Sequence, residues 1–420
     1  MIWGSRIVSY GQEMLLFMKK LWNKNFILLL QASAVSTIGD LMYSVAIGYW
    51  VYKQTGSNSL MGLMSSISMF VMMFLSPFSG SVVDKLSRKW VIVIGDAFQG
   101  ILMITMGILA YTNNLSVPGI LIAAFLAALG GVFYSPATST ALIDIIPHDD
   151  MVRGQSLFSG VNSTINMVGT AFSGVMVAFF GVPLIIVLNG ISNIYASISE
   201  LFISIPSTVQ EGERVTVKGV LKDSKSAIQT IISEPCLRIF VPCALIINLL
   251  AAGVFSLILP FTMEKDFSLD QYGYLMSVWT IGGLVGVVLL GIIKLKPKTR
   301  FWTMAIGFCL SCVFLVLAFL STEFLPLCIF AFLGAFMNTV GNSIFNASFV
   351  LALPEKNRGA IMGAFSSASI GGTAISSLIY GILGDIFPLY IVFSIGSALS
   401  LIPMLYLCFH PKTKNFILSH

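Results

Sequence analysis

Long stretches without a charged residue dominate the chain, and short clusters of charge separate them. The charge-free stretches cover residues 54–83, 97–143, 154–199, 239–263, 271–293, 301–322, 324–354, 359–384 and 386–411. A helix needs roughly 20 apolar residues to cross a hydrocarbon core of ~30 Å, and these stretches reach or exceed that length. The pattern therefore predicts an all-α integral membrane protein.

Two of the stretches are too long for a single membrane span. Residues 97–143 contain a turn signal at Asn113, and residues 154–199 contain one at Pro183. Because Asn, Gly and Pro clusters interrupt helices, each stretch is predicted to form two helices.

A first helix is predicted over residues 26–52. Its apolar run exceeds the roughly 7–15 residues of a signal peptide's hydrophobic region and no small-residue cleavage site follows, so we expect it to be retained. The total is twelve transmembrane helices, six before residue 206 and six after residue 238.

The predicted spans divide the chain into five parts. Residues 1–25 form a cytoplasmic N-terminal tail, 26–205 an N-terminal six-helix bundle, 206–237 a polar central loop, 238–410 a C-terminal six-helix bundle and 411–420 a cytoplasmic tail. Weak internal repeats support two related halves, since Gly80 aligns with Gly291. Parallel repeats of this kind are one known transporter construction.

The basic residues orient these helices. If the N-terminus is cytoplasmic, every Lys and Arg except Lys53 and Lys265 lies on the cytoplasmic side. This distribution obeys the positive-inside rule and places both termini in the cytoplasm. The net charge of +5 then reflects membrane topology and implies no nucleic-acid partner.

Composition and missing motifs exclude several function classes. Hydrophobic residues make up 56% of the chain and charged residues 10%, too few charges for a soluble surface. No Gly-Lys dipeptide of a phosphate-binding loop occurs, and three His cannot supply a zinc-hydrolase motif. We therefore expect no enzyme activity, no cofactor and no metal, and ATP-driven transport would need a separate ATPase partner.

Residues 80–89 resemble the signature loop between helices 2 and 3 of the major facilitator superfamily. In this loop a glycine, here Gly80, is followed by an aspartate, here Asp84, and by a basic cluster that includes Arg88 and Lys89. The resemblance implies two six-helix bundles that work by alternating access, and a latch on the cytoplasmic side built from these four residues. Arg88 has two candidate partners, Asp84 and Asp144. The alternative is that these charges serve topology alone.

Shorter segments narrow the resemblance to one group of the superfamily. Residues 36–40, 51–57 and 134–137 are similar to the drug exporters that include bacterial macrolide efflux proteins and siderophore exporters. This resemblance implies efflux of a small-molecule substrate across the bacterial inner membrane.

The sharpest candidate for ion coupling is Asp40, in the middle of the first predicted helix. A carboxylate at mid-span costs ~2.5–3.5 kcal/mol or more unless it faces a cavity, pairs or takes up a proton. Helical spacing places it on one polar face with Ser33, Ser36, Thr37 and Ser44. A structural role, as a hydrogen-bond acceptor that ties two helices together, is the alternative.

Asparagines recur every four residues in three predicted spans. These pairs and triplets are Asn162 and Asn166, Asn189 and Asn193, and Asn338, Asn342 and Asn346. Asparagine inside a membrane must be hydrogen-bonded, so each set faces protein or water. We take Asn162, Asn166, Asn338 and Asn342 as candidate cavity residues, with packing between helices as the alternative. Asp96 and Glu200 are further intramembrane acids without an assigned partner.

The favoured interpretation is a monomeric, proton-coupled drug antiporter that exports a macrolide-like amphipathic compound and thereby confers antibiotic resistance. Its partners are the substrate, protons and membrane lipid. Export of a siderophore or lysolipid, nutrient import by the same fold, and coupling to sodium remain open alternatives.

Overall fold

The computed structural model describes residues 21–83, 85–147, 150–205, 228–293, 296–353 and 358–414. The named elements in this part of the chain are helices. They are α2 (Lys24–Thr55), α3 (Asn58–Val83), α4 (Arg88–Tyr111), α5 (Val117–Ile145), α6 (Met151–Phe180), α7 (Val182–Leu201), α9 (Leu237–Ala251), α10 (Gly253–Glu264), α11 (Leu269–Ile292), α12 (Pro297–Leu320), α13 (Phe324–Ala352), α14 (Arg358–Ile386) and α15 (Leu389–Phe409).

These helices confirm the predicted membrane spans. Eleven segments of the described chain are long and apolar enough to cross a bilayer, and the bent pair Met151–Thr170 and Phe172–Phe180 raises the number to twelve if it is one span. The helices α9 and α10 together make one of the eleven, Leu237–Glu264.

The predicted turns lie where the sequence places them. Asn113 has a positive φ of 57° between α4 and α5, and Gly181 has a φ of 77° between α6 and α7. Ser116 caps the start of α5 by accepting a hydrogen bond from the Gly119 amide, and Pro183 lies in the first turn of α7. Both features are local helix-start signals, so they can be read without tertiary information.

The chain clusters into two compact units whose limits cut across the two predicted halves. Unit 1 takes the described residues within 1–46, 78–169 and 180–214, and unit 2 takes those within 47–77, 170–179 and 215–420. Part of the predicted first half therefore packs with the second half. The division into six-helix bundles at residues 206–237 stays a prediction, because the central loop lies largely outside the described residues.

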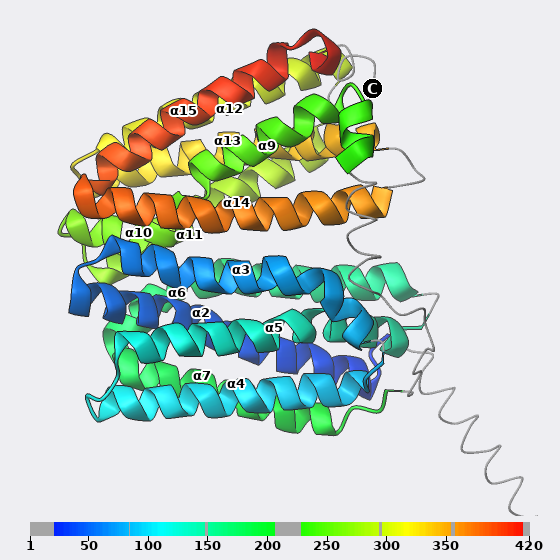
Figure 1. Ribbon diagram of the computed structural model, residues 1–420, viewed down its shortest axis with the longest axis vertical. Coiled ribbons are helices and arrows are strands. Elements are labelled where there is room, and N and C mark those ends of the chain that lie inside the picture. Colours follow the sequence, from blue (N-terminus) through cyan, green and yellow to red (C-terminus); the bar gives the residue numbers. More distant parts are fainter. Residues whose placement is uncertain are drawn as a thin grey trace, which may run out of the picture. The chain divides into compact units, whose positions relative to one another are not determined.

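Unit 1 is organised around the close contact of α4 with α7, which lie side by side (Figure 1). Gly100 and Gly190 face each other, and a Cβ on Gly100 would lie 2.9 Å from the Gly190 carbonyl oxygen. The Ser197 hydroxyl also donates to the Val93 carbonyl across this contact, at 2.8 Å. Small residues of this kind let membrane helices approach closely.

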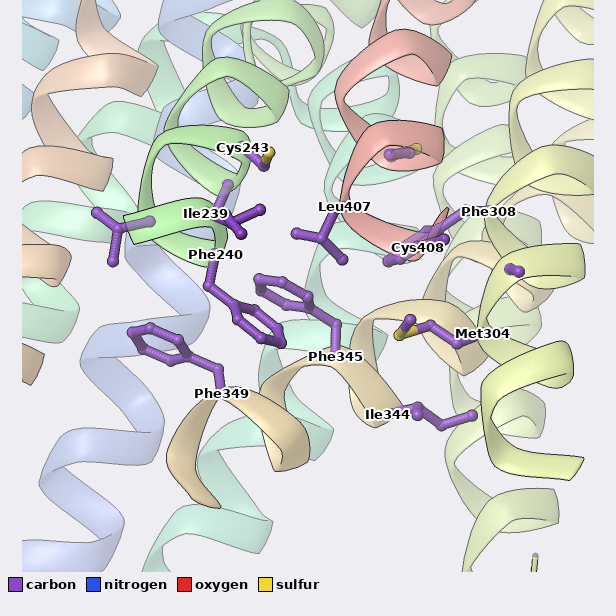
Figure 2. Packing of buried hydrophobic residues seen from close by; sticks show 14 of the residues in the cluster. Ile239, Phe240, Cys243, Met304, Phe308, Ile344, Phe345, Phe349, Leu407 and Cys408 are labelled. Atoms are coloured by element: carbon purple, nitrogen blue, oxygen red, sulfur yellow. The ribbon is translucent and has the colours of Figure 1, made fainter. Parts of the chain in front are cut away.

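Unit 2 has an aromatic and aliphatic core between α9, α12, α13 and α15. Figure 2 shows Phe240 of α9 against Phe345 and Phe349 of α13, with ring centroids 5.3 and 6.3 Å from Phe240. Met304 and Leu407 complete this part of the core and are fully buried. Many large apolar side chains elsewhere are exposed, as expected where lipid is the solvent.

Candidate functional site

Asp40 lies in the middle of α2 and is half-buried, facing protein from unit 1. The Gln99 side-chain amide, on α4, donates to the Asp40 carboxylate at 3.0 Å. Asn189 and Asn193, on α7, also lie within side-chain hydrogen-bonding reach of this carboxylate. Neutral amides from two other helices therefore face the acid, and the Asp96 carboxyl group on α4 lies close enough to act on it electrostatically. This arrangement is compatible with both the coupling and the structural interpretation.

The rest of the predicted polar face of α2 does not act as one set. The Ser33 hydroxyl is buried and donates to the Asn162 side-chain oxygen at 3.2 Å, and Ser36 is buried and bonds back to the Ser33 carbonyl at 3.3 Å. Thr37 is half-buried and Ser44 is exposed. Asp40 is thus flanked by residues in three different environments.

Asparagines of α6 and α13 form hydrogen bonds within their own helices. Asn342 donates to the Asn338 side-chain oxygen at 2.8 Å along α13. Asn166 is exposed and donates to the Asn162 backbone carbonyl, also at 2.8 Å. The bond from Ser33 of α2 to Asn162 is an interhelical contact of a predicted cavity residue on α6.

Two acids of unit 1 form a buried pair. Asp96 on α4 is 5% exposed and Glu200 on α7 is 1% exposed, and their carboxyl groups lie within hydrogen-bonding reach of each other. The Tyr134 hydroxyl, on α5, donates to Glu200 at 3.4 Å. Both acids are visible in the sequence, but their partnership depends on which faces of α4 and α7 meet.

The structure describes every residue of the predicted cytoplasmic latch except Asp84. Arg88, at the start of α4, forms an ion pair with Asp144 near the end of α5. Asp144 is one of the two partners that the sequence offers for Arg88. Lys89 donates to the Leu201 carbonyl at the end of α7, at 2.7 Å. Asp84 lies outside the described residues, and Gly80 lies in α3 with open space where a Cβ would be.

A second set of contacts, not predicted from the sequence, joins α3 to α14 within unit 2. The Asp385 carboxylate, at the end of α14, accepts hydrogen bonds from the backbone amides of Asn58 (2.5 Å) and Ser59 (3.1 Å) and from the Ser57 hydroxyl (3.0 Å). It therefore caps the start of α3, where amide groups lack helical partners and the helix dipole favours an anion.

The contact continues along both helices. The Ser66 hydroxyl donates to the Ala374 carbonyl at 2.7 Å. A Cβ on Gly62 would overlap the Ser377 carbonyl oxygen, so only glycine allows this approach. These residues lie towards the predicted outer side, and we call the contact formed by Ser57–Ser66 with Ala374–Asp385 the outer contact.

The two lysines predicted on the outer side have local aromatic partners. The Lys53 ammonium lies 5.6 Å from the Tyr49 ring centroid, and the Lys265 ammonium lies 5.2 Å from that of Phe261. Lys265 also donates to the Ser321 carbonyl at 2.5 Å, and partial burial lowers its pKa from the ordinary value. These contacts hold the two exceptions to the charge bias in place.

Comparisons with known proteins identify the family of this chain. A family model described as "Transmembrane secretion effector", a family of the major facilitator superfamily, matches residues 18–415. The multidrug efflux pump Tap of Mycobacterium bovis (strain BCG / Pasteur 1173P2) is 22% identical over 380 residues, which are 87% of this chain and 88% of Tap.

Two further similarities are more limited. Macrolide efflux protein A of Streptococcus pyogenes is 22% identical over 194 residues, which are 46% of this chain and 47% of that protein. The solved structure of the nucleoside transporter NupG superposes with a TM-score of 0.70 at 12% identity, over 90% of this chain and 97% of NupG. At this identity the superposition shows the fold alone.

Proposed function

Because the chain belongs to the transmembrane secretion effector family of the major facilitator superfamily, and is therefore a multi-pass membrane transporter and not an enzyme, we propose that it exports amphipathic or hydrophobic compounds from the bacterial cell by exchange for protons. The superfamily resemblance of residues 80–89 is confirmed by this family assignment.

The observation that carries the proposal is the environment of Asp40. Its carboxyl group lies halfway along a membrane-spanning helix and faces Gln99, Asn189 and Asn193, which can hydrogen-bond either a carboxylate or a carboxylic acid. An ionisable residue at this depth is a functional candidate because its charge is costly in the membrane. Asp40 can therefore take up and release a proton while its contacts with α4 and α7 persist in both protonation states.

The proton gradient supplies enough free energy for export. One proton carries ~1.4 kcal/mol per pH unit and ~2.3 kcal/mol per 100 mV of membrane potential. A total of ~4 kcal/mol sustains roughly a 10³-fold concentration ratio of substrate.

The substrate class rests on two lines of support. The spans carry few fixed charges, which favours an apolar or amphipathic compound over a sugar or a phosphate. The names of the similar proteins, a multidrug efflux pump and a macrolide efflux protein, point to drugs of the macrolide type. Siderophores, lysolipids and imported nutrients are the competing substrates that the experiment must separate.

A resistance and uptake screen in an efflux-deficient bacterial host tests the proposal. Cells expressing the chain should show increased resistance to erythromycin and reduced erythromycin accumulation, and a protonophore should abolish the difference. Asp40→Asn keeps the side-chain shape and should remove the resistance at an unchanged amount of membrane protein. Asp270→Asn, in the first turn of α11 at the outer side, is the matched control and should keep it.

Substrate-dependent uptake that exceeds that of empty cells would identify an importer. Wild-type resistance in cells carrying Asp40→Asn would refute the coupling role of Asp40, and dependence on a sodium gradient would replace the proton as coupling ion.

A further inference from the structure

Two buried acids of unit 1 carry unpartnered oxygen atoms. Six buried side-chain nitrogen or oxygen atoms of the described residues have no hydrogen-bond partner, and two of them belong to Asp96 on α4 and Glu200 on α7. Buried polar groups are nearly always hydrogen-bonded in proteins, so two such atoms on neighbouring acids require an explanation.

The two acids carry the most informative of these atoms. Asp96 Oδ2 and Glu200 Oε2 are the unpartnered oxygens of two carboxyl groups that face each other. A pair of ionised carboxylates offers only acceptors, and in a low-dielectric interior the two charges repel strongly. A single proton between them would convert one group into a donor, remove one charge and provide the missing hydrogen bond.

The groups that face this pair do not neutralise it in any other way. Asp40 approaches from α2, and Tyr134 approaches from α5 and donates to Glu200. In the part of the chain that the structure describes, no Lys, Arg or His lies within ion-pair distance of either acid. Of the two basic residues at this end of α4, Arg88 pairs with Asp144 and Lys89 donates to the Leu201 carbonyl.

The position of the pair connects it to Asp40. Asp96 and Gln99 lie three residues apart on α4, which places them on neighbouring positions of one helix face. Gln99 donates to Asp40, which lies at mid-span, whereas Glu200 is the penultimate residue of α7 at its predicted cytoplasmic end. The two sites therefore follow each other from the middle of the membrane towards the cytoplasm.

We propose that Asp96 and Glu200 share one exchangeable proton and form a second proton-binding site, on the cytoplasmic side of Asp40, from which the proton leaves the transporter. This inference rests on the proposed function, because it names the place where the coupled proton is held. The proton moves as H⁺ between carboxyl oxygens and water, so no other reactant takes part.

Infrared spectroscopy of the purified full-length protein tests the shared proton without a substrate. Wild type should show a carboxylic-acid C=O band that disappears reversibly as the pH is raised, and both Glu200→Gln and Asp96→Asn should lose that band. Glu323→Gln and Asp270→Asn, at the predicted outer side, are matched controls and should keep it. The inference is overturned if the band is absent from wild type or unchanged in both pair variants. It is also overturned if the band never responds to pH, because a purely structural proton would not exchange.

Transport in proteoliposomes tests the role of that proton, with erythromycin as the probe. Glu200→Gln should lose erythromycin-driven proton flux while it retains erythromycin exchange down a concentration gradient, because substrate binding remains intact. Asp96→Asn is the second variant if Glu200→Gln does not fold.

The outcomes separate the two proposals. A wild type that moves erythromycin without protons refutes the proposed function. A wild type and a Glu200→Gln variant that move protons equally refute only the role of the pair. Sodium-dependent transport that Glu200→Gln abolishes would make the pair a sodium site and overturn the proton assignment.

Discussion

The outer contact allows a quantitative prediction about alternating access. Asp385 caps α3 only while the ends of α3 and α14 are together, so removing its carboxylate should favour the state in which they separate. Loss of an N-cap side chain costs about 0.5–2 kcal/mol, and because Asp385 is exposed we expect about 1 kcal/mol. This corresponds to about a fivefold larger population of the outer-open state in Asp385→Ala.

Cysteine accessibility measures that population. Ser66→Cys, in a background without the six native cysteines, places a thiol at a position that is 0% exposed at the inner end of the outer contact. A membrane-impermeant maleimide added outside intact cells should label it about five times faster in Asp385→Ala, because slow labelling reports the open fraction. Asp270→Asn, which removes another negative charge on the predicted outer side, is the control and should leave the labelling rate unchanged. An unchanged labelling rate in Asp385→Ala would refute the capping argument.

Three other substitutions test the packing and the predicted latch. Gly62→Val should increase the same labelling without any change of charge, because its Cβ overlaps the Ser377 carbonyl. Arg88→Gln should lower the free energy of unfolding by about 1–3 kcal/mol, because the half-buried Asp144 loses its partner. In the double variant with Asp144→Asn, the two losses of unfolding free energy should not add. Gly39→Val should reduce the yield of folded protein in size-exclusion chromatography, because its Cβ would enter the contact of α2 with α7.

The sequence predicts the spans well because their signals are local. A run of about 20 apolar residues is sufficient to specify a membrane helix, and turn residues such as Asn113 and Gly181 act on their own backbone. Arg88 and Asp144 could be proposed as a pair because both lie at predicted cytoplasmic ends.

The missed contacts depend on the rotation of each helix about its axis. Asp96 and Glu200 are more than a hundred residues apart, and they meet only because the faces of α4 and α7 that carry Gly100 and Gly190 pack together. Asp385 caps a helix that begins more than three hundred residues earlier. Hydropathy does not encode this rotation when lipid-facing and buried residues are equally apolar, and the exposed Ser44 on the predicted polar face of α2 reflects the same limit.

The central claim is that export is driven by protons, and substrate-induced proton flux tests it most directly. In everted membrane vesicles with an acidified interior, addition of erythromycin should release protons through the wild-type protein, and Asp40→Asn vesicles should show no release. The account is contradicted if wild-type vesicles respond to erythromycin as vesicles without the protein do, while they still accumulate the drug.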